Sequence, residues 1–77
     1  MQIEILLFGQ LAEAAGQNKV RLEDVADSDT LIKQLHTLFP ELAKKPYVVA
    51  VDKDIISENT SLEGKNTVAL LPPYAGG

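Results

Sequence analysis

The sequence predicts a single α+β domain, in which one main helix covers one face of a mixed sheet of four to five strands. The 77 residues leave room for one domain only. Apolar residues make up 45% of the chain and charged residues 23%, a balance typical of a folded protein and not of a disordered one. Several short apolar runs are bounded by turn-forming residues, whereas only one segment has the spacing of a long amphipathic helix.

The first third of the chain contains two strand patterns separated by a short helix. Residues 2–8 (QIEILLF) are rich in large apolar side chains and predict a strand. Residues 10–15 (QLAEAA) are good helix formers and stop at Gly16, which predicts one or two helical turns. Residues 19–25 (KVRLEDV) alternate apolar and charged side chains, as a half-buried strand does.

The main helix is predicted from apolar residues that recur at spacings of three and four. These are Leu31, Leu35, Leu38, Phe39 and Leu42. Ser28 or Asp29 is expected to cap the helix, and Pro40 to end or kink it. His36 falls off the apolar stripe, so we expect a solvated surface histidine.

The second half of the chain contains three further strand patterns. Residues 47–51 (YVVAV) predict a strand buried on both faces or nearly so, and residues 52–54 predict a polar turn. A short strand at residues 55–56 and a turn-rich stretch at 57–66 precede the last strand, residues 67–71. The predicted core combines the first and last strands with the helix stripe and a plug in the turn-rich stretch: Ile3, Ile5, Leu7, Leu31, Leu35, Leu38, Leu62, Val68 and Leu70.

Composition excludes several classes of function. The chain has no cysteine and one histidine, so disulfides, thiolate chemistry and multi-histidine metal sites are ruled out. The net charge of −4 opposes nucleic-acid binding and favours a basic protein surface as partner. No apolar run approaches the length of a membrane span, and no signal segment opens the sequence. We therefore expect a cytoplasmic protein without a bound cofactor, and the sequence contains none of the usual catalytic constellations.

The reactive group of the protein is expected in a short C-terminal tail. Residues 1–73 form the predicted domain, and residues 74–77 (YAGG) a flexible tail. A terminal pair of glycines is expected by chance in about half a per cent of chains. Pro72-Pro73 favours an extended arm, and glycines without Cβ let a narrow channel close around the backbone. The Gly77 carboxylate is the group that adenylation could activate for attack by sulfur or an amine.

Three stretches of the sequence resemble the small subunit of molybdopterin synthase. They are FGQLAEAAG at residues 8–16, AVD at residues 50–52 with Leu62 after it, and VALLPPYAGG at residues 68–77. The sequence departs from the family pattern at Ala12, where arginine is often found, at Asp52, where asparagine is common, and at residues 64–67. The resemblance covers nearly the whole chain and implies a ubiquitin-like β-grasp fold with the first and last strands central and parallel.

The resemblance also implies a reaction cycle. An E1-like adenylyltransferase uses ATP to adenylate the Gly77 carboxylate, and a persulfide donor supplies sulfur to make a thiocarboxylate. The tail then enters the large subunit, where the sulfur becomes the dithiolene of molybdopterin in molybdenum cofactor biosynthesis. In this cycle Gly77 carries the sulfur, Gly76 supplies clearance, and the catalytic side chains belong to the large subunit.

A partner surface is expected beside the root of the tail. Strand alternation places Leu6, Phe8 and Leu71 on the face away from the helix, and Ile55 matches a family position in the same region. The alternative is that a loop covers these residues as a second small core. The full set of expected partner-binding residues is Leu6, Phe8, Ile55, Leu71, Pro72, Pro73, Tyr74 and Ala75.

Other functions remain open at the level of sequence. Thiamine-pathway sulfur carriers share the fold and the Gly-Gly end, but they are usually shorter and lack the Pro-Pro. Ubiquitin-like carriers for tRNA thiolation have longer chains than this one, which makes them a less fitting class. A β-grasp binding module with an incidental Gly-Gly is the alternative from a different class.

Overall fold

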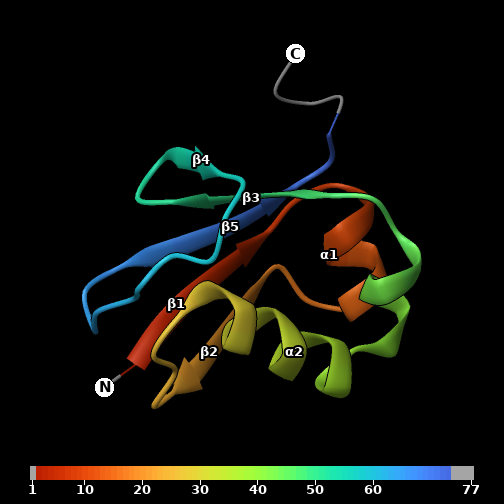
Figure 1. Cartoon of the computed structure of the whole chain (residues 1–77). Coiled ribbons are helices and arrows are strands. Elements are labelled where there is room, and N and C mark those ends of the chain that lie inside the picture. Colours follow the sequence, from red (N-terminus) through yellow and green to blue (C-terminus); the bar gives the residue numbers. More distant parts are fainter. Residues whose placement is uncertain (1, 74–77) are drawn as a thin grey trace.

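The computed structural model describes residues 2–73, which form one sheet, two α-helices and one 3-10 helix (Figure 1). In chain order the elements are β1 (Gln2–Leu7), α1 (Gln10–Ala15), β2 (Lys19–Glu23), α2 (Ser28–Leu38), η1 (Pro40–Lys44), β3 (Val48–Val51), β4 (Asp54–Ile56) and β5 (Thr67–Leu71). The predicted short helix and last strand have these same bounds, and the main helix ends before Pro40 as expected.

The sheet is mixed, with the strand order β2-β1-β5-β3-β4. The first and last strands of the chain pair in parallel, and all other pairs are antiparallel. This is the ubiquitin-like β-grasp arrangement, so the predicted fold class is confirmed.

The core lies between the sheet and α2. Along β1 the buried and more exposed residues alternate, because successive side chains of a strand point to opposite faces. The fully buried side chains are Ile3, Ile5, Leu7, Leu11, Val25, Leu31, Leu35, Leu42, Val68 and Leu70. Leu62 is 5% exposed and plugs the core from the turn-rich stretch, as predicted.

Leu38 is not part of this core, which corrects the sequence prediction. It is 55% exposed, whereas Leu35 one turn earlier is completely buried. Leu38 is the last residue of α2, and the chain then turns into η1. Phe39 and Leu42 cover the core at this end, so the side chain of Leu38 has no buried position to fill.

The cap of α2 also differs from the expectation of Ser28 or Asp29. Asp27 occupies the cap position with extended backbone, and its Oδ1 accepts the Thr30 N–H at 2.9 Å. The hydrogen bonds from Thr30 and from the Asn59 amide lower the pKa of the Asp27 carboxyl. Ser28 is buried instead, and its Oγ accepts the Thr60 N–H at 2.8 Å. Asp27 and Ser28 therefore tie the start of α2 to the turn-rich stretch.

Three strands end earlier or start later than predicted, and the first of them, β1, ends at Leu7, one residue before Phe8. β2 stops at Glu23 because Asp24 adopts a positive φ of 56°, which breaks the extended backbone. Tyr47 precedes β3, and Val48 and Val49 are half-buried, so this strand is covered less completely than its apolar run predicts.

His36 is half-buried and is not the solvated residue that its position off the stripe suggests. Its Nε2 lies 2.9 Å from the Tyr47 hydroxyl, and the two rings meet edge to face. The pair joins the end of α2 to the segment before β3. Burial raises the pKa of the Tyr47 hydroxyl above its ordinary value of 10.

Candidate partner-docking groove

An apolar groove of about 520 Å³ lies on the face of the sheet that α2 leaves open. We call it the open-face groove. It is lined by Leu6, Phe8, Ala50, Asp52, Lys53, Ile55, Thr67, Ala69 and Leu71. The lining comes from four strands and the turn between β3 and β4, so the sheet itself forms the base of the groove.

The strand register explains the shape of the groove. Leu6 pairs with Ala69, Ala69 with Ala50, and Ala50 with Ile55, so these four residues form one row across the sheet. Residues paired in register point to the same face. The two alanines in the middle of the row are small, and the larger side chains at its ends rise beside them. The result is a hollow with an alanine floor and apolar walls.

The four sequence-predicted apolar residues of the partner surface all line this groove. Phe8 is 44% exposed and Ile55 is 61% exposed, while Leu6 and Leu71 are half-buried. No described loop covers them, so the alternative of a second small core does not hold for Phe8 and Ile55. Aromatic residues, Phe included, are enriched at protein interfaces, so Phe8 is a candidate interface anchor.

The root of the tail is fixed next to the groove. Pro72 is buried and Pro73 is exposed, and the backbone N–H of Phe8 donates to the Leu70 carbonyl at 3.3 Å. Gly9 has a φ of +56°, and a Cβ added there would lie 3.1 Å from Pro72 Cγ. The chain therefore leaves the sheet at a packed position, within two residues of the groove wall formed by Leu71. The tail residues named above as site candidates, Tyr74, Ala75, Gly76 and Gly77, lie outside the described residues.

A tight turn closes the far end of the groove. Asp52 and Lys53 both have positive φ values, 49° and 76°, as the two central residues of a tight hairpin turn do. The Asp52 carboxylate accepts the Thr67 N–H at 2.9 Å and the Asn66 side-chain amide. These two hydrogen bonds lower the pKa of the Asp52 carboxyl. They also tie the turn to the start of β5, so the end of the groove has a defined shape.

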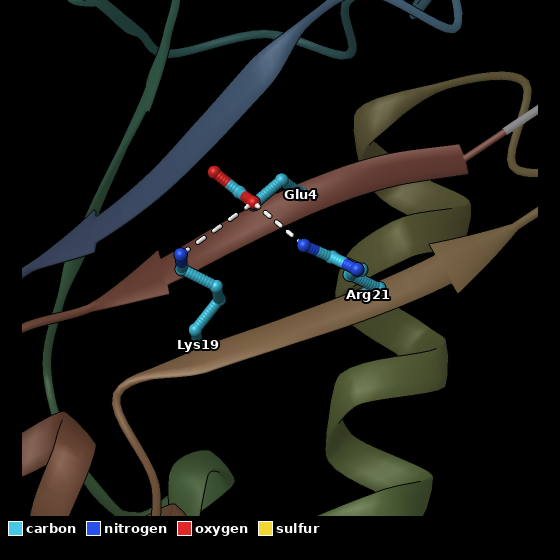
Figure 2. A network of polar contacts seen from close by, with 3 residues as sticks. All are labelled: Glu4, Lys19 and Arg21. Atoms are coloured by element: carbon cyan, nitrogen blue, oxygen red, sulfur yellow. Dashed lines mark ion pairs between the residues drawn. The ribbon is translucent and has the colours of Figure 1, made fainter.

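Charged residues of β1 and β2 border the groove on the β2 side of the sheet. The Glu4 Oε2 lies 3.8 Å from Lys19 Nζ and 3.7 Å from Arg21 Nη2. Figure 2 shows the three side chains in front of the strands, with α2 behind them. Lys19 is paired in register with Leu6, so this charged border adjoins the groove wall.

Sequence reasoning missed five lining residues: Ala50, Asp52, Lys53, Thr67 and Ala69. Alternation with Leu71 could have placed Ala69 on the open face. Ala50 comes next to Ala69, and Ile55 next to Ala50, only through the register between strands, which cannot be read from the sequence pattern. The charged border depends on the same register.

Residues 2–73 contain neither a candidate metal-binding cluster nor a helix that could span a membrane. No group of three or more histidine or carboxylate side chains in this range is arranged to hold a metal ion. No helix in this range is long and apolar enough to cross a membrane.

Comparison with known protein families identifies one match over most of the chain. The ThiS family model matches residues 5–77.

Solved structures show the same fold at low sequence identity. A protein from Pyrococcus furiosus, described as molybdopterin converting factor subunit 1, has a TM-score of 0.87 at 16% identity, with 95% of this chain and 98% of that chain covered. Small archaeal modifier protein 1 of Haloferax volcanii has a TM-score of 0.81 at 23% identity, over 94% and 97% of the two chains. A chain in a complex of subunits 1 and 2 of the Helicobacter pylori molybdopterin-converting factor has a TM-score of 0.73 at 24% identity, over the full length of both.

Proposed function

The chain belongs to the ThiS family and is a ubiquitin-like sulfur carrier, and we propose that it serves as the small, sulfur-donating subunit of a molybdopterin synthase. The observation that carries the proposal is the position of the open-face groove. An apolar docking surface adjoins the wall residue Leu71 and the packed Pro72, directly before the four-residue tail. A partner held in the groove would receive the tail at a fixed place.

The reactive group in this proposal is the Gly77 carboxylate. An E1-like enzyme transfers AMP from ATP to the carboxylate, with pyrophosphate as the leaving group. The terminal sulfur of a persulfide donor then attacks the acyl carbon and AMP leaves, because an acyl-adenylate is a far better electrophile than a carboxylate. A thiol then attacks the donor sulfur of the resulting acyl disulfide, forms a disulfide with the donor and releases the thiocarboxylate of the carrier. The product of the cycle is a C-terminal thiocarboxylate. Since this activation needs ATP, we place the protein in the cytoplasm.

The large subunit of the synthase is the proposed docking partner. The Helicobacter pylori complex joins subunits 1 and 2 of a molybdopterin-converting factor, and its matching chain has the fold described here. By analogy, Phe8 and Ile55 would bury their exposed side chains against the large subunit. The large subunit would then supply the catalytic side chains. This chain would supply the sulfur and hold it in position.

The proposal is tested by exchanging the carrier in a reconstituted synthesis. The thiocarboxylated chain is incubated with the molybdopterin synthase large subunit of the same organism and its pterin substrate. In a parallel reaction it is offered to the thiazole-forming enzyme of thiamine synthesis. We expect dithiolene formation in the first reaction only. Sulfur transfer only in the second would assign the chain to the thiamine pathway.

A second candidate is a protein modifier, which the similarity in fold to small archaeal modifier protein 1 favours. The chemistry differs in one step, because a lysine amine and not sulfur would attack the activated Gly77 carbonyl. The product would be an isopeptide bond. Peptide mapping of cell extracts for lysines that carry the terminal glycines of this chain separates this candidate from the first.

A further inference from the structure

The chain segment that follows β1 packs against the segment that follows β5. The parallel pairing of Leu7 with Leu70 continues for one hydrogen bond beyond β1, because the Phe8 N–H donates to the Leu70 carbonyl at 3.3 Å. The next residues of the two segments then meet. A Cβ built on Gly9 would lie 3.1 Å from Pro72 Cγ, so the buried proline ring occupies the space beside the glycine. A side chain at this position does not fit unless one of the two segments moves.

Gly9 is the fixed side of this contact. Its backbone, with φ +56° and ψ −129°, has a conformation that glycine adopts far more easily than other residues. The Gly9 carbonyl accepts the Glu13 N–H at 3.3 Å, and the Phe8 carbonyl accepts the Leu11 N–H at 3.1 Å. Leu11 is itself buried in the core. Since α1 holds Gly9 in place, an added side chain would displace Pro72.

A displacement of Pro72 changes the direction in which the chain leaves the sheet. Leu71 and Pro72 each precede a proline, and a following proline restricts the backbone of the preceding residue to extended conformations. The ring of each proline also fixes its own φ. The direction of the chain at Pro72 is therefore carried over to Pro73, the last residue that the structure describes.

The contact between Gly9 and Pro72 adjoins the open-face groove on both of its sides. Phe8 directly precedes Gly9, Leu71 directly precedes Pro72, and both Phe8 and Leu71 line the groove. A protein seated in the groove would thus lie against the two residues next to the contact. The contact then determines where the chain leaves the sheet relative to the docked protein.

We propose that Gly9 is a positioning residue for sulfur transfer: it makes room for the Pro72 ring, and Pro72 in turn sets where the tail enters the docked protein. The inference rests on the proposed function in taking the molybdopterin synthase large subunit as that protein. Because Gly9 acts through Pro72 and does not line the groove, it should influence the rate of sulfur transfer and not the affinity of docking.

Single-turnover sulfur transfer separates these two quantities. The thiocarboxylated full chain is mixed with increasing concentrations of the large subunit and its pterin substrate. The half-saturating concentration reports docking, and the limiting rate reports how well the sulfur is placed. Gly9→Ala should lower the limiting rate about three- to tenfold, because small displacements of a reacting group are costly. The half-saturating concentration should not change.

Gly16→Ala is the matched control for a substitution at a positive φ. Gly16 has a φ of +76°, and a Cβ built there meets nothing within 4 Å. This variant should keep the limiting rate of the unchanged chain. Melting temperatures confirm that each variant is folded under the conditions of the assay.

Pro72→Ala separates the contact from backbone strain at Gly9. It removes the ring that Gly9 accommodates, so it should lower the limiting rate by itself. In this background Gly9→Ala should cause no further decrease, since the two substitutions act on one contact. The strain at Gly9, by contrast, is present in both backgrounds.

Three results would overturn the inference while leaving the proposed function intact. The first is a limiting rate for Gly9→Ala equal to that of Gly16→Ala. The second is a higher half-saturating concentration with an unchanged limiting rate, which would assign Gly9 to docking. The third is an equal decrease in the two backgrounds, which would assign the effect to backbone strain. If the unchanged chain transfers no sulfur to the substrate of the large subunit, the proposed function fails, and the inference fails with it.

Discussion

Two apolar residues show how the face of the sheet decides a side chain's role. Leu35 is completely buried between α2 and the sheet, whereas Phe8 is 44% exposed beside the open-face groove. Hydropathy alone ranks both as core residues. Phe8 directly follows β1 and lines the groove together with Leu6, on the face opposite the buried Ile3, Ile5 and Leu7, so its side chain is available to a partner.

Truncation of Leu35 should affect stability. Leu35→Ala should lower the free energy of unfolding by about 2–5 kcal/mol, because it removes buried methyl groups and leaves a cavity. Urea denaturation measures this value. A loss below about 0.5 kcal/mol would mean that Leu35 lies at the surface and that the core is described wrongly.

Truncation of Phe8 should affect binding. Phe8→Ala should weaken binding to the large subunit by more than about 1 kcal/mol, because an aromatic anchor at the groove wall is lost. Its melting temperature should change little. Calorimetric titration and thermal unfolding measure the two effects, and Leu38→Ala, which truncates an exposed leucine outside the groove, is the matched control. Lower stability with unchanged affinity would assign Phe8 to the core.

At the level of elements, the turn between β3 and β4 is stabilised by two residues that depart from the family pattern. Asp52 stands where asparagine is common, and Asn66 lies in the altered stretch before the last strand. In the structure the Asn66 amide donates to the Asp52 carboxylate. The two departures therefore belong to one contact, which joins the turn to the start of β5.

This contact predicts an acid-sensitive element. The pKa of Asp52 is lower in the folded chain than its ordinary value of 3.8, so the unfolded chain binds more protons in this range. The stabilisation is present above about pH 3.8 and is lost as the pH falls through the lower folded pKa. Asp52→Asn keeps an acceptor for the Thr67 N–H but has no charge. The melting temperature of this variant should be lower than that of the unchanged chain at neutral pH, and this difference in melting temperature should shrink in acid. A difference independent of pH would contradict this account.

The elements of the fold could largely be predicted from the sequence because each has a strong local signal. The apolar period of three and four located α2, and the run before Pro72 located β5. The cap of α2 was predicted one or two residues late, because Asp27, Ser28 and Asp29 are all suitable capping residues and only the fold selects among them. The groove floor could not be predicted, since Ala50 and Ala69 meet through strand register and not through sequence spacing.

At the level of the whole molecule, the chain combines a closed core, an open apolar face and the Pro72-Pro73 end of the described residues beside that face. The core lies between α2 and one side of the sheet, and the groove lies on the other side. Figure 1 shows α2 on one side of the sheet, with β5 between β1 and β3. Under the proposed function, substitutions on the open face should therefore alter docking and leave folding unchanged.

The measurement that tests the central claim most directly is the mass of the chain after activation. The full chain is incubated with its E1-like enzyme, ATP and a persulfide donor, and a variant without Gly77 is treated in the same way. We expect the full chain to gain about 16 Da, the difference between sulfur and oxygen, on its C-terminal peptide, and the shortened variant to gain nothing while melting at the same temperature. An unchanged mass of the full chain, or an equal gain in the variant without Gly77, would contradict the account.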